Sequence, residues 1–197
     1  MLATESALLH EADPEPLHQT LSERRQRFEQ LVLPHLGAAY NLARWLTRND
    51  HDAQDVVQEA VLRAYRFFDG LRGEAKPWLL SIVRNSCFTW LHLNRPADLV
   101  GLDDDRVGLL PVDGDGPETR AARALDRRLL NDAIAALPTR FREVLILREL
   151  EDLPYKDIAR IADVPIGTVM SRLARARRLL ADALQAKYET QEAQVHK

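Results

Sequence analysis

Residues 154–180 read PYKDIARIADVPIGTVMSRLARARRLL and decide the fold of the second half of the chain. Within this stretch Ile158 and Ala162 lie one helical turn apart, so they share one face of a short helix. A short turn follows, and apolar residues then recur with helical spacing, at Val169, Leu173, Ala176 and Leu180. Two helices joined by a short turn and packed through such faces are typical of a helix-turn-helix.

The outward face of the second predicted helix carries hydroxyl and arginine side chains, and Gly167 near its start leaves room for a partner to approach. Arginine can fork onto guanine edges or onto phosphates, and a helix matches the width of the DNA major groove. The alternative is a solvated basic helix at the end of a bundle, but the preceding helix and the turn favour DNA recognition. The candidate DNA-binding residues are Thr168, Ser171, Arg172, Arg175, Arg177 and Arg178.

Helical spacing of apolar residues also dominates the rest of the chain, so the sequence predicts an all-α protein with two small helical domains. We expect these domains at residues 22–96 and 125–188. Residues 97–124 are rich in Gly, Pro and Asp and cannot bury much surface, which indicates a flexible linker. Residues 1–21 are expected to form a flexible N-terminal extension, and residues 189–197 a C-terminal tail.

Several residues are predicted to set helix boundaries. Pro34 is expected to end or kink the first helix, and Asp50 to cap the helix that runs from about residue 52 to 68. Pro77 suits the first turn of the helix that reaches about residue 93. Thr139 is expected to cap a helix of the second domain.

Composition excludes several classes of protein. The chain has 46% hydrophobic residues and a formal net charge of -3, so any basic surface must be local. Its single cysteine, Cys87, forms neither an internal disulfide nor a zinc site, which fits a reducing, cytoplasmic setting. The six histidines are scattered, and no Gly-rich phosphate loop follows a strand, so we expect no enzyme, no cofactor and no metal. No apolar run approaches the roughly 20 residues of a membrane-spanning helix, so we expect no membrane insertion.

The second half of the chain resembles region 4 of extracytoplasmic-function (ECF, group IV) sigma factors of the sigma-70 family. The resemblance lies in Leu137-Pro138, in Arg142-Glu143-Val144, in the stretch 153–159 (LPYKDIA) and in the stretch 164–177 (VPIGTVMSRLARAR). In that family, region 4 reads the -35 element of the promoter. The position of Met170 is often basic in the family, and this departure bears on the exact -35 sequence rather than on the role.

The first half resembles region 2 of the same family. Residues 52–60, DAQDVVQEA, are similar to region 2.2, the helix that grips the β′ coiled coil of RNA polymerase. Asp55, Gln58 and Glu59 lie on one side of this predicted helix, and such an acidic, hydrogen-bonding face suits a basic helical partner. An ordinary solvated face is the alternative from charge alone, and the resemblance favours polymerase binding.

Residues 67–76 and the helix that follows them are similar to regions 2.3 and 2.4, which open the promoter and capture the -10 element as a single strand. Such capture needs aromatic walls for an extruded base and basic groups for the backbone. We expect Trp78 or Phe68 to belong to the core. The candidate -10 residues are Arg72, Lys76, Trp78, Arg84, Asn85 and Phe88.

The resemblance implies a transcription initiation factor with defined partners. These are core RNA polymerase, at its β′ coiled coil and β flap, promoter DNA, and an anti-sigma factor that holds the protein inactive in a stress response. A stand-alone helix-turn-helix regulator is the alternative, and its binding to promoters would not require polymerase. An anti-sigma-type protein of the zinc class would need a cluster of one His and two Cys, which a single cysteine excludes.

Overall fold

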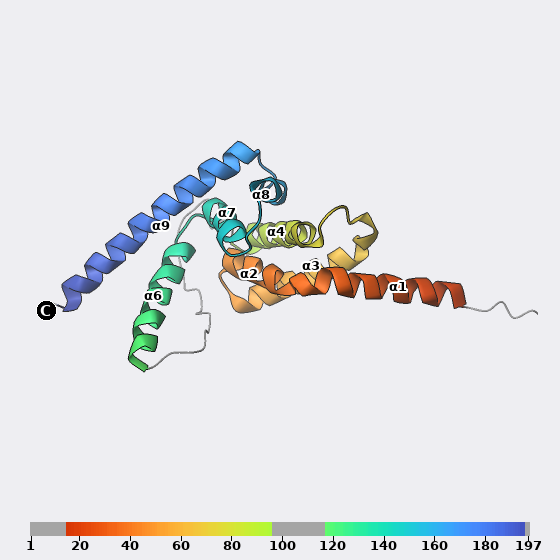
Figure 1. Ribbon diagram of the computed structural model, residues 1–197, viewed down its shortest axis with the longest axis horizontal. Coiled ribbons are helices and arrows are strands. Elements are labelled where there is room, and N and C mark those ends of the chain that lie inside the picture. The colour runs from red at the N-terminus through yellow and green to blue at the C-terminus, as the bar shows by residue number, and fades with distance from the viewer. Residues whose placement is uncertain (1–14, 96–116, 196–197) are drawn as a thin grey trace, which may run out of the picture.

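The computed structural model describes residues 15–95 and 117–195, and these residues are helical with short turns between the helices (Figure 1). We call residues 15–95 the N-terminal bundle and residues 117–195 the C-terminal bundle. The N-terminal bundle contains α1 (Glu15–Val32), η1 (Leu33–His35), α2 (Leu36–Thr47), α3 (Asp50–Arg66), η2 (Phe68–Gly70) and α4 (Ala75–Asn94). The C-terminal bundle contains α6 (Pro117–Ala135), α7 (Thr139–Glu149), α8 (Tyr155–Ala162) and α9 (Ile166–Val195). The all-α prediction is therefore confirmed.

In the N-terminal bundle α2, α3 and α4 pack against one another around a shared apolar core. Pro34 lies in η1, a short 3-10 turn that separates α1 from α2, as expected for a residue that cannot donate a helical hydrogen bond. The cap of α3 differs from the prediction: Asn49, rather than Asp50, has extended backbone dihedrals and accepts hydrogen bonds from the amides of His51 and Asp52.

The core of the N-terminal bundle is built from small and large residues at helical spacing. On α3 the fully buried side chains are small, which lets α2 and α4 approach the helix closely. Phe68 is 4% exposed and belongs to the core, as expected, whereas Val57 and Val61 of α3 are only partly buried. The large fully buried side chains here include Leu42, Trp45, Leu46, Leu79, Leu80 and Leu91.

In the C-terminal bundle α8 and α9 form the predicted helix-turn-helix. Ile158 of α8 and Val169 and Leu173 of α9 are buried, so the apolar faces expected from the sequence do meet in the core. Asp163 ends α8 with a φ of 52°, a left-handed conformation that Asp adopts more readily than most residues. This residue turns the chain sharply enough for α9 to begin at Ile166.

Other boundaries also differ from those predicted. Helix α1 begins at Glu15, inside the stretch expected to form a flexible N-terminal extension. Helix α6 begins at Pro117, inside the predicted linker, where proline suits a first helical turn. Thr139 is the first residue of α7 and is buried, and Pro138 occupies the capping position without a side-chain hydrogen bond. The rest of the predicted linker, residues 97–116, lies outside the described residues.

A buried arginine joins α7 to the end of α6. Arg142 is 1% exposed, and its guanidinium donates hydrogen bonds to the carbonyl oxygens of Ala135 and, at 3.1 Å, of Leu137. Carbonyls at the end of a helix have no partner within that helix, and a cation near them also interacts favourably with the helix dipole. Arg142 therefore ties the turn between α6 and α7 to the body of the bundle.

We expect Arg142→Met to destabilise the protein by about 2–3 kcal/mol, because it leaves buried carbonyls without a donor. The exposed Arg140 of the same helix provides a matched control, and Arg140→Met should change stability by no more than about 0.5 kcal/mol. Thermal unfolding followed by circular dichroism measures both. Equal midpoints for the two variants would contradict the structural role of Arg142.

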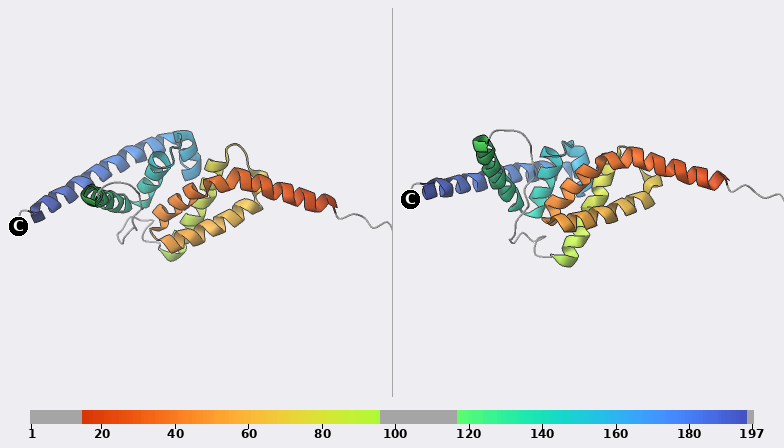
Figure 2. Two further views of the ribbon diagram at one scale, coloured as in Figure 1. Left: turned by 60° about the horizontal axis from the view of Figure 1, so that its bottom comes forward. Right: turned by 90° about the horizontal axis from the view of Figure 1, so that it is seen from below.

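The two bundles pack against each other. Helix α4 lies against α8, and α2 lies against α7, while α1 and the far end of α9 project away from this contact at opposite ends of the molecule (Figure 2). We call this packing the closed arrangement. It brings residues 76–84 of the N-terminal bundle next to residues 143–151 of the C-terminal bundle.

Candidate nucleic-acid interface

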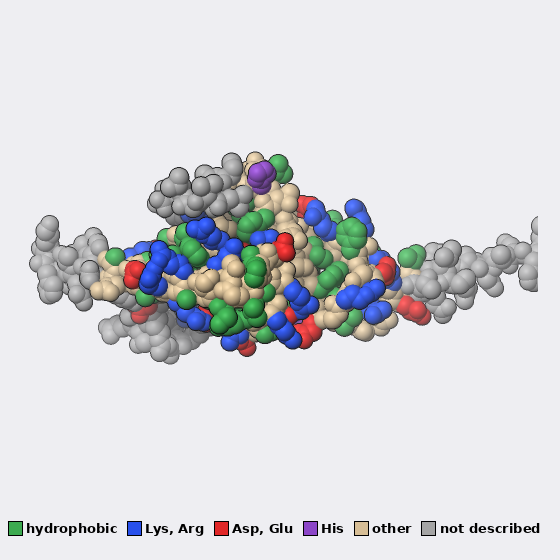
Figure 3. Space-filling view, turned by 90° about the horizontal axis from the view of Figure 1, so that it is seen from above, with side chains coloured by type: hydrophobic (Ala, Val, Ile, Leu, Met, Phe, Trp, Pro, Cys, Tyr) green, Lys and Arg blue, Asp and Glu red, His purple; other side chains and the backbone are tan. Residues whose placement is uncertain are grey.

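Three of the candidate -35 residues lie on the open surface of α9. Ser171, Arg175 and Arg178 are exposed, while the opposite face of the helix packs through Val169 and Leu173 into the core. Figure 3 views the molecule from the side of α8 and α9, where Lys and Arg side chains are spread over the surface. Exposure on one open helix face is what contact with a groove of duplex DNA would require.

The other three candidate -35 residues are less available. Thr168 and Arg172 are half-buried. The positive charge of Arg172 acts to lower the pKa of the buried Glu143 of α7. Arg177 donates to the Glu149 carboxylate of α7 at 2.6 Å, in an exposed ion pair. The geometry therefore groups Ser171, Arg175 and Arg178, and assigns Arg177 to a contact within the bundle.

The candidate -10 loop is the stretch 69–76, which begins in η2 and ends in the first turn of α4. Gly73 has a φ of 78°, which a residue with a side chain would adopt only with strain. Arg72 is exposed, and its guanidinium donates to the loop's own carbonyl oxygens of Asp69 and Leu71 at 3.2 Å. The loop thus has a defined shape and presents the Arg72 guanidinium to solvent.

Arg84 of α4 lies in the contact between the bundles. Its Nε donates to Oε1 of Glu143 at 2.6 Å, and its guanidinium stacks 4.0 Å from the centre of the Phe88 ring. The Arg84 side chain is 17% exposed and that of Glu143 only 1% exposed. Asn85 beside it is exposed, whereas Phe88 is half-buried against the core. In the closed arrangement the Arg84 guanidinium is therefore paired with a carboxylate of the C-terminal bundle.

Lys76 is held in the same way at the end of the candidate loop. Its ammonium group contacts the Glu151 carboxylate at 2.9 Å and donates to the Glu151 carbonyl oxygen at 2.8 Å. Asn41 of α2 donates to the same carboxylate at 3.4 Å. Trp78, two residues further on, is half-buried and packs against the core. Two of the candidate -10 cations, Lys76 and Arg84, are therefore paired with acids of the C-terminal bundle that the sequence does not link to them.

Burial governs the titration of the groups at this contact. Desolvation raises the pKa of Glu143, and the positive charges of Arg84 and, more weakly, Arg172 oppose the increase. One carboxylate oxygen of Glu143, Oε2, is buried without a hydrogen-bond partner, which is consistent with this direction. Burial, together with the charge of Glu143, also raises the pKa of the Cys87 thiol, so this cysteine has little thiolate character at neutral pH.

The candidate polymerase-binding residues lie on the outer face of α3. Asp55, Gln58 and Glu59 are all exposed, and Glu59 pairs with Arg63 one turn later at 2.7 Å. Beside them lies an apolar groove of about 330 Å³ between α2 and α3. Its lining consists of Leu36, Tyr40, Gln54, Val57, Gln58, Val61 and Leu62.

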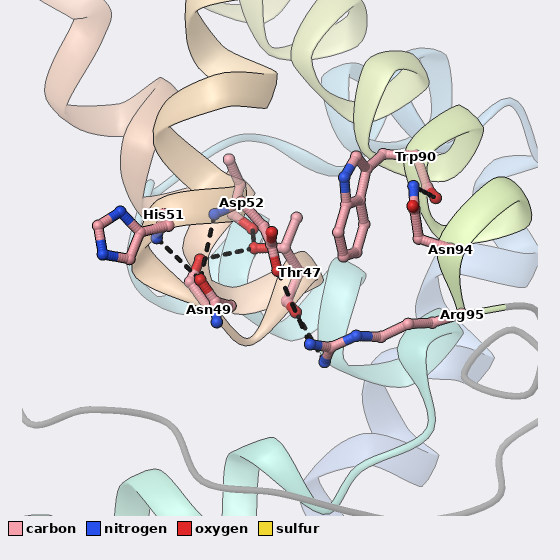
Figure 4. Close-up of polar contacts among 8 residues, drawn as sticks. Thr47, Asn49, His51, Asp52, Trp90, Asn94 and Arg95 are labelled. Atoms are coloured by element: carbon pink, nitrogen blue, oxygen red, sulfur yellow. Dashed lines mark hydrogen bonds and ion pairs between the residues drawn. The ribbon is translucent and has the colours of Figure 1, made fainter.

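A polar cluster joins the start of α3 to the end of α4 (Figure 4). Arg95 reaches back from the end of α4 to the Thr47 carbonyl oxygen at 3.5 Å and to the Asp52 carboxylate at 3.7 Å. Its guanidinium lies 5.6 Å from the centre of the Trp90 ring. The cluster therefore links the start of α3, the helix that carries the acidic face, to the end of α4.

Among the described residues, no group of three or more His, Cys, Asp or Glu side chains is arranged to hold a metal ion. Within the same ranges, none of the helices combines the length and the apolar character that crossing a membrane requires.

Comparison with protein families matches two separate parts of the chain. Residues 31–95 match the family described as sigma-70 region 2, and residues 127–180 match the family described as sigma-70, region 4. The first match runs from the end of α1 through α4, and the second runs from the middle of α6 to the middle of α9. The acidic face, the candidate loop and the helix-turn-helix all lie inside these matches.

Curated relatives are similar along nearly their whole length. The ECF RNA polymerase sigma-E factor of Haemophilus influenzae is 36% identical over 181 residues, which cover 85% of this chain and 95% of the relative. The RNA polymerase sigma-H factor of Pseudomonas aeruginosa is 34% identical, with coverage of 85% and 93%. The ECF sigma-E factor of Escherichia coli is 33% identical, with coverage of 85% and 94%.

Two solved structures share the fold. The sigma factor RpoE in complex with the anti-sigma factor NepR from Bartonella quintana is 27% identical, with a TM-score of 0.68 and coverage of 81% of this chain and 98% of that one. CnrH, in complex with the cytosolic domain of CnrY, is 23% identical, with a TM-score of 0.60 and coverage of 86% and 94%. The second likeness supports the fold alone.

Proposed function

Since the chain belongs to the ECF sigma factors of the sigma-70 family, we propose that its acidic α3 face docks on core RNA polymerase while its two bundles read the promoter. The protein is a promoter-directing initiation factor that works with core polymerase, and neither a stand-alone regulator nor an enzyme. The main support for this function is the 36% identity to a sigma factor over 95% of that relative's length. Run-off transcription with purified core polymerase and genomic fragments tests it.

The assignment of residues to these tasks is part of the proposal. Residues 22–96 would bind polymerase and capture the -10 strand, and residues 125–188 would read the -35 element as duplex. The exposed Arg175 and Arg178 support the second task, and the exposed Asp55 and Glu59 support the first.

The closed arrangement is not the state that binds the -10 strand. Lys76 and Arg84 are engaged by Glu151 and Glu143, so phosphates could reach them only after the bundles separate. Polymerase would hold the bundles apart, because its β′ coiled coil and β flap are separate docking sites. Since a solved relative is bound to an anti-sigma factor, we further propose that such a factor holds this protein closed, in the cytoplasm where polymerase works.

We expect Arg175→Ala to weaken the free energy of recognition of a cognate promoter by about 1–3 kcal/mol, the cost of a lost bidentate contact to a base. The loss should depend on the -35 sequence. Arg177→Ala is the matched control from the same helix, because Arg177 is engaged by Glu149. Its effect should be small and independent of sequence. Transcription rates on wild-type and -35-substituted promoters measure both, and an Arg177 effect as large and as sequence-dependent would contradict the assignment.

A further inference from the structure

The start of the candidate -10 loop is held by an arginine from far earlier in the chain. Arg24 of α1 directs its Nε to both carboxylate oxygens of Asp69, at 3.1 and 3.2 Å. Its terminal nitrogen donates to the Tyr65 carbonyl oxygen at 2.7 Å, and its guanidinium lies 4.6 Å from the centre of the Tyr65 ring. One side chain thus contacts both the last turn of α3 and the first residue of the loop.

The helix that carries Arg24 is firmly attached at this point. Phe28, one turn later on α1, is 5% exposed and makes edge-to-face contacts with the Tyr65 and Phe68 rings at centroid distances of 5.1 and 5.2 Å. Isolated surface ion pairs contribute little because ordering two long side chains costs entropy. Here the Arg24 side chain is only 24% exposed, and packing already limits its motion. The ion pair with Asp69 therefore costs less side-chain entropy than it would on an open surface.

The two ends of the loop are anchored differently. Lys76 at its end is bound to Glu151 of the C-terminal bundle, and this contact is lost when the bundles separate. The Arg24–Asp69 contact lies wholly within the N-terminal bundle and does not depend on that packing. Arg72 in turn donates to the Asp69 carbonyl oxygen, so the position of this exposed cation follows that of Asp69.

We propose that Arg24 is a positioning residue for strand capture: it holds Asp69, and through it Arg72, in the shape that receives the -10 strand once the bundles have separated. The inference rests on the proposed function of the loop. Arg24 also balances the charge of the Asp69 carboxylate, which is 78% exposed beside the expected path of the phosphates. An unbalanced carboxylate there would repel the strand.

The test uses holoenzyme reconstituted from core polymerase and the full chain, on a promoter that the wild-type protein transcribes. Permanganate reactivity of -10 thymines measures strand opening, and gel filtration measures core binding. Arg24→Ala should bind core normally and open the promoter about three- to tenfold more slowly, since charged hydrogen bonds at a partly exposed site contribute modestly. Arg25→Ala is the matched control, because Arg25 is exposed and pairs only with Glu29 of its own helix in the described contacts. It should open at the wild-type rate.

A charge swap separates positioning from general stability. Arg24→Asp combined with Asp69→Arg should restore opening relative to either single variant, with thermal midpoints recorded for all of them. Equal opening rates for wild type and Arg24→Ala would overturn the positioning role alone, as would a stable swap that opens no better than the single variants. If the wild-type holoenzyme transcribed none of the promoters offered to it, so that no such promoter could be chosen, the proposed function would fail, and the role of Arg24 with it.

Discussion

Reversing two charges on α3, with Asp55→Lys and Glu59→Lys, should abolish holoenzyme formation. Both side chains are exposed in the structure and lie one turn apart, beside the apolar groove between α2 and α3. A basic helical partner would be attracted by the native face and repelled by the altered one, and like charges across an interface cost several kcal/mol. Gel filtration with core polymerase measures the loss directly.

A control must change the net charge by the same amount elsewhere. Glu23 and Glu29 of α1 are also exposed acids on a helix of the same bundle, so Glu23→Lys with Glu29→Lys provides it. Each variant loses one ion pair within a helix, Glu59–Arg63 in the α3 variant and Arg25–Glu29 in the control, and such a pair contributes only about 0.2–0.5 kcal/mol. We expect the control to co-elute with core. If the α3 variant co-eluted equally and transcribed normally, the docking face would lie elsewhere.

The helix-turn-helix could be predicted from sequence because the signal is local. Buried Ile158, Val169 and Leu173 recur at helical spacing, and few other structures satisfy that pattern on both sides of a short turn. The cap of α3 was placed one residue late for a related reason. Asn49 and Asp50 are both good capping residues, and only the backbone dihedrals, extended at Asn49, distinguish them.

The partners of the candidate -10 cations could not be predicted from sequence. Arg84 and Glu143 are 59 positions apart, and Lys76 and Glu151 are 75 apart, so no helical period links them. The Arg24–Asp69 contact, 45 positions apart, has the same origin in tertiary packing. Sequence reasoning identified cations suited to DNA, and the structure adds the acids that engage them in the closed arrangement.

Removing the guanidinium of Arg84 should open the closed arrangement. The Glu143 carboxylate is 1% exposed, and Arg84 is the partner of its Oε1, at 2.6 Å. Deleting one member of a buried pair costs about 3–5 kcal/mol because an uncompensated charge is left behind. In the variant Arg84→Leu the Glu143 carboxylate has lost this partner. Separation of the bundles would expose the carboxylate to water and so remove that cost. Small-angle X-ray scattering of the full chain should show a larger radius of gyration than that of the wild type.

Two further variants isolate the buried charge as the cause. Arg63→Leu removes an ion pair of similar length, 2.7 Å, from the exposed face of α3, and should leave the scattering curve unchanged. Adding Glu143→Gln to Arg84→Leu removes the stranded charge and should restore the compact form. Without that recovery, the opening would have to come from lost packing against Phe88 rather than from the charge.

The same charge gives the Arg84→Leu variant a pH dependence with a defined sign. Burial raises the pKa of Glu143 in the closed arrangement, and losing the opposing charge of Arg84 raises it further. The closed form therefore binds more protons than the open form, in which Glu143 titrates in water, so lowering the pH favours closure. The variant should become compact again as the pH falls through the raised pKa towards the ordinary value of a glutamic acid. A radius of gyration that is independent of pH over this range, or that grows as the pH falls while the helical content is kept, would show that Glu143 does not control the contact.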